Sequence, residues 1–519
     1  MNKKYAARAA AVIEIGSNNV RMQISQMSKG VFSTLDNLEY PVNLGHDVFG
    51  DGYISFDSLR ELSAVLGKFS EALLSYGIEK PKVISCTVMR EAKNRSLAAD
   101  QLKVRNGMNV SVLEDSEEKA YLYSEIVQKL ENAEYLKNCH SLIAFIGSGS
   151  IGIAVYDGNK VIYSQNISMG ALKLHDVMAK LHRDVDDFHQ IIEEYLDTVL
   201  NRIHISEFHI QNLILTGSEI HQIARLCGAK GDGAPYRIET KKLTSLYYTI
   251  RSMSPESIGQ RYGISTEKAA VFYSALSIYC GMLRFCKEAS GIISPAVDIS
   301  EAVARYLLAP KTAPDFRAYL RESALACAEV TAKRFGCNLE HSERTSSFSC
   351  KLFDKLKKLH GLDPSKRLIL ELASLLHSCG SYVSVRQHNK CTYDLIKGMD
   401  IFGLRQLEVS EIAFVAGSIT ENFAAESNSE FVLLPEEEKI IISKLAAIFR
   451  MANALDKSHQ GKLSNLRVNL EEDRVLFRAD AVDGNYMLER WAFEESAGFF
   501  KNVFGLSPEL IVKLDRKLQ

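Results

Sequence analysis

Two spacings of apolar residues divide this chain into regions of different character. Alternation of apolar and polar residues predicts strands, and helical spacing predicts a helix over about 55–76 and little but helices over about 313–457. The runs that read as strands are AAVIEIG, VRMQIS, KVISCTV, SLIAFIG, IGIAVYD and KVIYSQN. From about 243 to 308 the chain is expected to be helical, and LSNLRVNLEEDRVLFRADA returns to alternation. The pattern predicts α/β structure followed by an all-helical part and a small α+β part.

The α/β part repeats one arrangement. Each half opens with two strands joined at a tight Gly/Ser turn, the first at Gly16-Ser17-Asn18 and the second at Gly147-Ser148-Gly149-Ser150. We therefore predict two similar α/β domains, then a helical domain and a C-terminal domain. Their expected ranges are 1–130, 131–310, 311–460 and 461–519.

Composition and charge limit the classes of function. The 519 residues are 46% hydrophobic and 24% charged, and 62 basic against 64 acidic residues leave a net charge of -2. No overall field attracts the chain to DNA or to a membrane. The likeliest candidate for a membrane span, 271–285, is interrupted by polar residues and predicts a buried helix. The ten cysteines show no Cys-x-x-Cys spacing, which favours reduced thiols and a cytoplasmic protein.

The two Gly/Ser turns are candidate phosphate sites. They lie between paired strands and carry no Gly-Lys-Ser sequence, so they match neither a Walker loop nor a dinucleotide fingerprint. Successive backbone N–H groups in a tight turn bind anions, and Ser17, Asn18, Ser148 and Ser150 add side-chain donors. Two such turns at matching positions predict a phosphate-binding cleft between the halves.

Further segments resemble the exopolyphosphatase and guanosine pentaphosphate phosphatase family. AVIEIGSNNVRMQIS is similar to its first phosphate loop, CTVMREAKN to its arginine-bearing helix start, LEDSEEKAYLY to its catalytic-glutamate segment and LIAFIGSGSIGIAVYDG to its second loop. LELASLLHSCG and RMANALDKS resemble the helical HD-type domain of the long members. The resemblance spans the chain and implies two actin-like (ribonuclease H-like) domains, a helical HD-like domain and a small C-terminal α+β domain.

The departures from the family pattern fall on its acids. Lys119 stands where the resemblance implies the catalytic glutamate, and Phe145 and Gly152 stand where it implies the acids that hold metal and water. Glu14 replaces an aspartate and Lys173 an arginine. In the helical part the His-Asp pair becomes His377-Ser378 and a later aspartate becomes Asn453, whereas His341 and Asp456 remain. We therefore expect no metal in the helical domain.

These replacements favour binding over turnover. Phosphoanhydride hydrolysis needs Mg²⁺ held by carboxylates and a group that positions water, and phenylalanine cannot bind a hard cation. The predicted ligand-binding residues are Gly16, Ser17, Asn18, Arg90, Lys119, Gly147, Ser148, Gly149 and Ser150. Glu118 and Glu14 are the candidate catalytic residues if activity remains, with Mg²⁺ as the only expected cofactor. The expected ligands are polyphosphate or a guanosine polyphosphate, hydrolysed weakly or not at all.

Two alternatives stay open at this point. A slip at the helix start could present Glu117 or Glu118 to the cleft and retain a Mg²⁺-dependent phosphohydrolase, although one residue turns a helix by about 100°. The acids could equally form the solvated first turn of a helix capped by Asp115 or Ser116. The third class is a regulatory or structural dimer without ligand, since the resemblance implies a homodimer.

Two other features have ordinary explanations. A basic run that could attract polyphosphate is interleaved with Leu352, Phe353, Leu356 and Leu359, which favours an amphipathic helix with a solvated basic face. Its members are Lys351, Lys355, Lys357, Lys358, Lys366 and Arg367. His204 and His209 lack zincin spacing and are expected at the surface.

Overall fold

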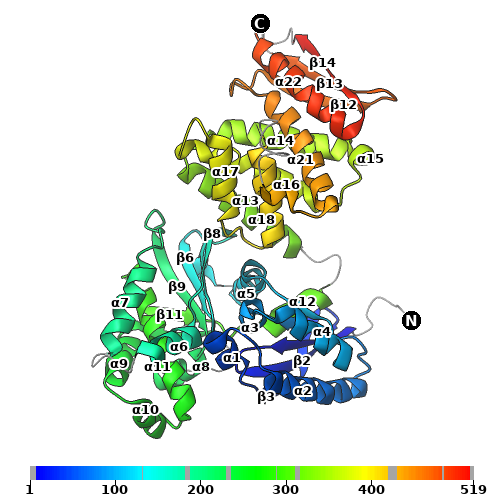
Figure 1. Cartoon of the computed structure of the whole chain (residues 1–519). Helices are drawn as coiled ribbons and strands as arrows, with labels where there is room; N and C mark the ends of the chain where they lie inside the picture. The colour runs from blue at the N-terminus through cyan, green and yellow to red at the C-terminus, as the bar shows by residue number, and fades with distance from the viewer. Residues whose placement is uncertain are drawn as a thin grey trace. The chain divides into compact units, whose positions relative to one another are not determined.

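The computed structural model describes residues 8–130, 133–181, 188–229, 235–287, 289–309, 316–418, 429–481 and 484–514. The chain forms two compact units, Met1–Leu320 and Arg321–Gln519 (Figure 1). The predicted boundaries at 130/131 and 310/311 adjoin or lie in segments outside the described residues. These boundaries stay predictions.

The first unit contains two mixed sheets. The strands of the first sheet, in the order β3-β2-β1-β4-β5, are β1 (Arg8–Ile15), β2 (Asn19–Ser28), β3 (Val31–Pro41), β4 (Lys82–Ser85) and β5 (Val110–Val112). The second has the order β10-β11-β9-β6-β7-β8, with β6 (His140–Ile146), β7 (Ile151–Tyr156), β8 (Val161–Ile167), β9 (Ile210–Gly217), β10 (Tyr236–Glu239) and β11 (Gly291–Ser294). Both open with an antiparallel meander whose first strand then pairs in parallel with a later strand. The predicted repetition is confirmed.

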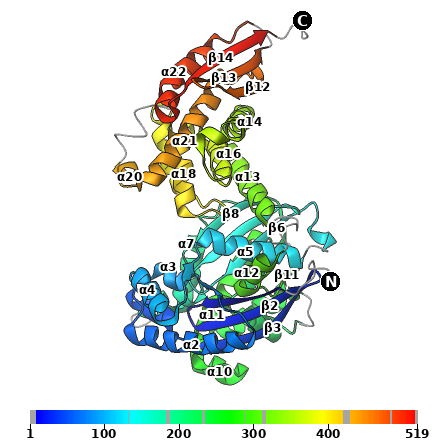
Figure 2. The ribbon, with the colours of Figure 1, turned by 90° about the vertical axis from the view of Figure 1, so that its right-hand side faces the viewer.

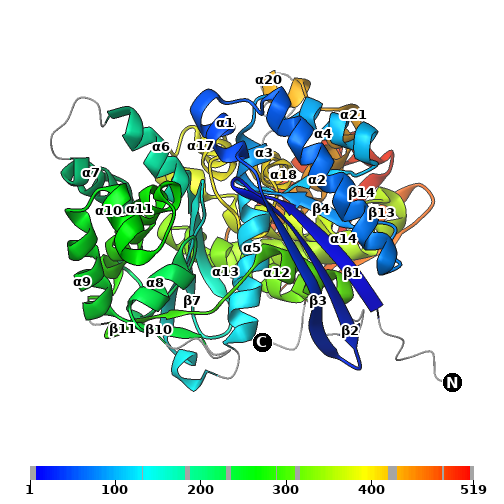
Figure 3. The ribbon, with the colours of Figure 1, turned by 90° about the horizontal axis from the view of Figure 1, so that it is seen from below.

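The helices of the first unit follow or cover these strands. They are α1 (Leu44–Asp51), α2 (Phe56–Ser75), α3 (Thr87–Glu91), α4 (Arg95–Asn106), α5 (Asp115–Lys129), α6 (Ala171–Leu181), α7 (Phe188–Leu200), α8 (Ile220–Leu226), α9 (Thr240–Arg251), α10 (Pro255–Tyr262), α11 (Thr266–Met282) and α12 (Ile299–Leu308). Short 3-10 turns lie at Glu134–Leu136 and Leu283–Phe285. Helix α12 packs against β1, β2 and α5, so the chain returns to the first sheet after completing the second (Figure 3).

Local sequence explains where several of these elements begin and end. Helix α2 buries one apolar face, whose members recur mostly every three or four residues: Leu59, Leu62, Val65, Leu66, Phe69 and Leu73. The Ser55 hydroxyl caps the helix by accepting a hydrogen bond from the Ser58 backbone N–H. The predicted strand KVISCTV is wrong at its end, because β4 stops at Ser85 and α3 begins at Thr87. The expected helical stretch 243–308 is also interrupted, since β11 adds to the sheet. The apolar stretch 271–285 contributes to α11, whose residues are largely buried.

The second unit is helical with one small sheet. Its helices are α13 (Phe316–Arg334, whose first residues belong to the first unit), α14 (Leu339–Lys355), α15 (Lys357–His360), α16 (Lys366–Leu376), α17 (His388–Lys397), α18 (Gln406–Gly417), α20 (Ser429–Val432), α21 (Glu436–Ala454) and α22 (Met487–Phe504), with a 3-10 turn η5 at Cys379–Tyr382. The sheet has the order β12-β13-β14, with β12 (Leu463–Leu470), β13 (Arg474–Ala481) and β14 (Ser507–Leu514). Helix α22 packs against β14 and α21 (Figure 2).

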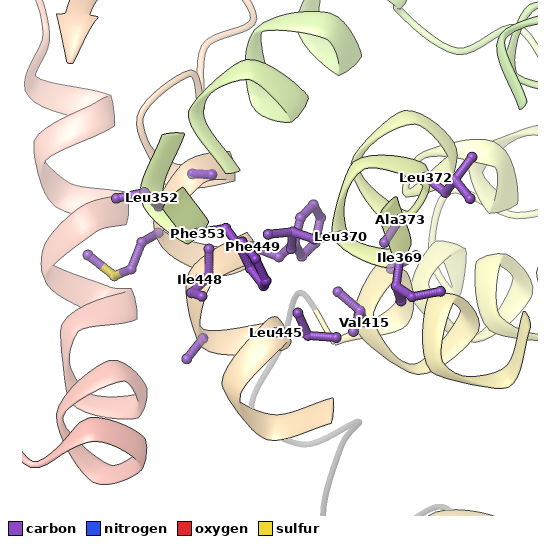
Figure 4. Packing of buried hydrophobic residues seen from close by; sticks show 14 of the residues in the cluster. Leu352, Phe353, Ile369, Leu370, Leu372, Ala373, Val415, Leu445, Ile448 and Phe449 are labelled. Atoms are coloured by element: carbon purple, nitrogen blue, oxygen red, sulfur yellow. The ribbon is translucent and has the colours of Figure 1, made fainter. Parts of the chain in front are cut away.

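One hydrophobic core runs through the second unit. Leu352 and Phe353 of α14, Leu370 of α16 and Phe449 of α21 pack together in it (Figure 4). The same buried cluster continues into Phe477 of β13 and into α22. The predicted boundary at 460/461 therefore falls within a continuous core.

Candidate functional site

The two Gly/Ser turns meet in the first unit. Ser17 follows β1 and Ser148 follows β6, and their hydroxyl oxygens lie 3.1 Å apart. Each turn is closed by a backbone hydrogen bond, from Gly16 N–H to Asn19 O at 2.9 Å and from Gly147 N–H to Ser150 O at 2.8 Å. Equivalent turns of the two lobes thus bring hydroxyl and backbone donors to one place, an arrangement suited to an anion.

Glycine is required where the second turn packs most tightly. A Cβ atom on Gly149 would lie 2.3 Å from Cγ2 of Thr87, and one on Gly170 would lie 2.5 Å from the backbone N of Gly149. No side chain fits at these distances. The backbone of the turn is therefore held closely by α3 and by the start of α6.

Lys119 lies beneath the second turn and is fully buried. Its ammonium nitrogen donates to Ser150 Oγ at 3.1 Å and to Glu118 Oε1 at 3.2 Å. It also lies 5.0 Å from the ring centroid of Phe145, within the range of a cation–π contact. The ammonium group predicted to bind ligand thus faces protein groups, and its contact with the turn is through Ser150.

Gly152 belongs to the same packing unit. A Cβ atom at this position would lie 2.7 Å from Cδ and Cε of Lys119 and 2.5 Å from the Tyr123 hydroxyl oxygen. The lysine stem leaves no room for a side chain at Gly152, and Phe145 supplies the ring beside the ammonium. The replacements at 119, 145 and 152 therefore fit one another sterically and electrostatically.

Arg90 ties α3 to the start of α5. Its guanidinium donates to Asp115 Oδ1 at 2.6 Å and to the Leu113 carbonyl at 2.6 Å, and it pairs with Glu118 at 3.4 Å. Asp115 Oδ1 also accepts from Ser150 Oγ at 3.0 Å. Arg90 stays a predicted phosphate contact, and in this structure its donors serve these internal acceptors.

Glu117 and Glu118, the alternative acids at the start of α5, also have partners within the protein. Glu114, not Asp115 or Ser116, is the N-cap of α5, and its backbone N–H donates to Glu117 Oε2 at 3.2 Å. Glu118 is buried between Arg90 and Lys119. Glu117 therefore serves the capping box and Glu118 an ion-pair network.

Glu14 lies at the end of β1 in a second charged group that the sequence reasoning missed. Asp298 caps α12 and pairs with Arg21, and Ser300 Oγ lies 3.3 Å from Glu14 Oε2. Burial, reinforced by the charge of Asp298, raises the pKa of Glu14 to about 8. The Asp-Ile-Ser sequence at 298–300, an N-cap signal before an apolar helix, was the available clue.

Lys173 connects the two lobes. Its ammonium lies 2.8 Å from Glu91 Oε1, which joins α6 to α3. Asn18 of the first turn is exposed, whereas Ser17 is buried. The structure thus brings together both turns, and it places Arg90 and Lys119 behind them.

A polar cluster lies inside the second unit. His341 Nδ1 is 2.9 Å from Asp456 Oδ2, and His341 Nε2 is 3.2 Å from both Asn453 Oδ1 and His377 Nε2. His377 Nδ1 faces the Ser374 carbonyl at 2.8 Å and must donate to it, so its Nε2 is an acceptor. Burial, reinforced by His341, lowers the pKa of His377 to about 3.

The basic run has a solvated face, as predicted. Leu352, Phe353 and Leu356 are buried, whereas Lys351, Lys355, Lys357 and Lys358 are exposed. Lys366 pairs with Glu411, and Arg367 pairs with Asp354 and Glu371. Leu356 breaks the helix, so the run spans α14, α15 and the start of α16. His204 and His209 are exposed, as expected.

The paired lobes, with strand orders that match and with Gly/Ser turns meeting between them, define the actin-like class of phosphate-handling folds. Residues 23–298 match the family model described as the Ppx/GppA phosphatase family, and residues 324–491 match its domain III model. The chain belongs to the Ppx/GppA phosphatase family.

Two solved structures are similar to the first part of the chain, and the first of them supports the fold. A crystal structure of an exopolyphosphatase from Cytophaga hutchinsonii is 18% identical, with a TM-score of 0.51, covering 58% of this chain and 98% of that chain. The Ppx/GppA family member from Aquifex aeolicus is 19% identical, with a TM-score of 0.49, covering 57% of this chain and 96% of that chain. The actin-like fold predicted from the sequence is confirmed.

The residues present do not fit the divalent cation that the family resemblance implies. Phe145 and Gly152 offer no ligand atom, and Lys119 brings a positive charge to the carboxylates that remain. Among the described residues, no three His, Cys, Asp or Glu side chains are grouped as a metal site.

Within the same residues, no helix is long and apolar enough to cross a bilayer.

Proposed function

We propose that this protein binds a phosphate-rich ligand, polyphosphate or a guanosine polyphosphate, at the paired turns and hydrolyses it slowly or not at all. The observation that supports this proposal is the interlocked set Lys119, Phe145 and Gly152 beside two intact Gly/Ser turns. The turns supply N–H and hydroxyl donors for phosphate oxygens. The set beside them supplies no carboxylate for a hydrolytic metal.

The charge around Lys119 explains why turnover should be lost. Hydrolysis of a phosphoanhydride requires neutralisation of charge as it develops on the transferred group and a base that positions water. The ammonium of Lys119 contacts Glu118 and lies 3.9 Å from Asp115, and Arg90 contacts both acids. Both acids are therefore engaged by fixed cations and are not free to position water or to hold a metal ion. The loss of one catalytic group alone costs about 10²–10⁴ in rate.

A second candidate function is Mg²⁺-dependent hydrolysis of the same ligands, and Glu14 is the observation in its favour. A carboxyl group whose pKa is raised to about 8 is mostly protonated at neutral pH and is suited to acid–base chemistry. Under this alternative Glu14 acts at the first turn, and Glu14→Gln abolishes phosphate release.

Release of orthophosphate separates the two. The purified full-length protein is incubated with long-chain polyphosphate or pppGpp, with and without Mg²⁺ or Mn²⁺. We expect a rate near background for the wild type and an unchanged background for Glu14→Gln. A metal-dependent rate of about one per second or more, typical of working enzymes, together with its loss in Glu14→Gln, would instead establish the hydrolase.

From the family resemblance we also infer that the protein is a homodimer and cytoplasmic. In the second unit we infer an HD-like helical domain and a small C-terminal α+β domain. The His341, His377 and Asp456 cluster supports the HD-like assignment. Replacement of the paired aspartate by Ser378 supports a domain without metal, which element analysis of protein purified without chelator tests. One tightly bound metal ion per chain that is lost in His377→Ala would contradict it.

A further inference from the structure

Two cysteines from distant parts of the second unit lie against each other. Cys337 lies between α13 and α14, and Cys379 is the first residue of η5. Their sulfur atoms are 3.4 Å apart, although the residues are separated by more than forty positions. A disulfide bond measures about 2.05 Å, so the sulfurs need to approach by little more than 1 Å to bond.

The two thiols differ in exposure and in acidity. Cys337 is half-buried and Cys379 is fully buried. The hydrogen bond from the Cys379 thiol lowers the pKa of Cys337 to about 7, and the same bond, with burial, raises the pKa of Cys379. The thiolate is the nucleophilic form of cysteine. Cys337 thus has the accessibility and the charge of an attacking group, and Cys379 has the position of a resolving thiol.

Four other cysteines have a raised pKa, in contrast to the lowered pKa of Cys337. Burial raises the pKa of Cys86, Cys227, Cys280 and Cys350, which keeps these thiols protonated and unreactive at neutral pH. Cys337 therefore stands out in both geometry and chemistry.

The pair also adjoins the histidine cluster. Cys337 precedes His341 by four residues, and Cys379 follows His377 by two. Between His377 and Cys379, the side chain of Ser378 reaches Cys337, and its hydrogen bond also lowers the pKa of that thiol. A covalent link between the cysteines would join the segment before α14 to η5 and would restrain the two histidines that face each other across them.

We propose that Cys337 and Cys379 form a peroxide-sensitive dithiol that closes to a disulfide bond. The Cys337 thiolate attacks the terminal oxygen of a hydroperoxide, which breaks the O–O bond, releases an alcohol or water after protonation and leaves a sulfenic acid on Cys337. The Cys379 thiol then attacks the Cys337 sulfur, the S–S bond forms, and water leaves with the hydroxyl group and the thiol proton. The two thiols lose two electrons and two protons in total, and the peroxide is reduced.

Mass mapping of the full-length protein tests the proposal. The protein is treated with hydrogen peroxide, the remaining thiols are alkylated, and the peptides are identified before and after reduction. We expect a linked peptide pair containing Cys337 and Cys379. Closing this long loop should raise the unfolding temperature of the second unit by roughly 5 °C. Fluorescence of Trp491, the single tryptophan, reports that unfolding.

Three variants assign the order of the steps. In Cys379→Ser, the sulfenic acid on Cys337 should persist and be trapped by dimedone, whereas Cys337→Ser should leave Cys379 reduced. Cys391→Ser, which removes another half-buried thiol from α17, should form the link as the wild type does. Recovery of Cys337 and Cys379 as separately alkylated peptides, at peroxide doses that oxidise Cys391, overturns the proposal. So does a Cys337 that dimedone fails to label in Cys379→Ser.

Discussion

The paired turns of the first unit and the histidine cluster of the second unit both lack acids that the family pattern has. The side chains that stand in their place interact differently in the two sites. At the turns, the positive charge comes from Lys119, held between Glu118 and Ser150, and the backbone donors of both turns are retained. In the cluster, a proton on His341 faces Asp456, and the groups around it are enclosed.

The two sites differ in which polar groups stay available to a ligand. A tethered cation next to an anion-binding turn still leaves N–H and hydroxyl groups for phosphate. A buried histidine–carboxylate pair satisfies its own hydrogen bonds and packs beside the core. The comparison supports the proposal that the turns bind ligand, and it favours a structural role for the histidine cluster.

The largest expected effect is at Lys119. Lys119→Met keeps the volume but removes the buried ammonium, so Glu118 and Asp115 share only Arg90. Removing one partner of a buried ion pair costs about 3–5 kcal/mol, and the remaining arginine places this variant near the lower value. Chemical denaturation followed by far-ultraviolet circular dichroism measures the loss in the first unit. A variant as stable as the wild type would show that the lysine is not an essential counter-ion.

Gly152→Ala should have the next largest effect. The added methyl group meets the Lys119 stem and the Tyr123 hydroxyl, and overpacking of this kind costs about 1–3 kcal/mol. In a Lys119→Ala background the cost should fall, which a double-mutant cycle measures as coupling. Gly67→Ala in α2 is the matched control: it has open space around it and should stabilise the helix slightly. Additive effects at 119 and 152 would contradict the interlocked packing.

The acid sensitivity of the second unit should depend on His377. Its pKa is lowered to about 3 from an ordinary value of 6.5, so the folded unit prefers the neutral ring. The stabilisation is complete above about pH 6.5 and is lost as the pH falls toward 3. His377→Gln, which cannot take up a proton, should show a shallower fall in stability over that window, by Trp491 fluorescence. Equal slopes for both proteins would assign the acid sensitivity to other groups.

An effect of similar size and opposite sign is expected at Glu14. Because its pKa is raised to about 8 from 4.5, the folded state holds the proton more tightly than the unfolded state. Stability from this group is present below about pH 4.5 and is lost as the pH rises to 8. Glu14→Gln should therefore be relatively more stable than the wild type at pH 8 than at pH 5, by calorimetry. A difference that is constant with pH contradicts the shifted carboxyl.

The sequence predicted most helices and strands correctly, because the spacing of apolar residues reflects which face of each element is buried. The apolar face of α2 and the strands around both turns follow from spacing that the sequence displays directly. The end of β4 was misjudged because β-branched residues in the Cys86-Thr87-Val88 segment favour a strand, whereas tertiary packing makes it a helix.

The candidate site was harder to predict because its contacts are distant in sequence. The turns were recognised, but the fit between Lys119 and Gly152 depends on a contact between α5 and β7. Asp298 reaches Arg21 across 277 positions. Lys119 was predicted to bind ligand from its charge and Arg90 from the family resemblance. Only the three-dimensional structure reveals the acids that they face.

The most direct test of ligand binding at the turns is calorimetric titration of the full-length protein with a short polyphosphate or pppGpp in the presence of excess chelator. We predict binding without metal that weakens about tenfold or more in the double variant Ser17→Ala with Ser148→Ala, which removes two hydroxyl donors worth about 1 kcal/mol each. Lys357→Ala with Lys358→Ala, in the basic run, should leave nucleotide binding unchanged. Absence of binding, a strict requirement for Mg²⁺, or affinity that survives the double serine variant would contradict the account.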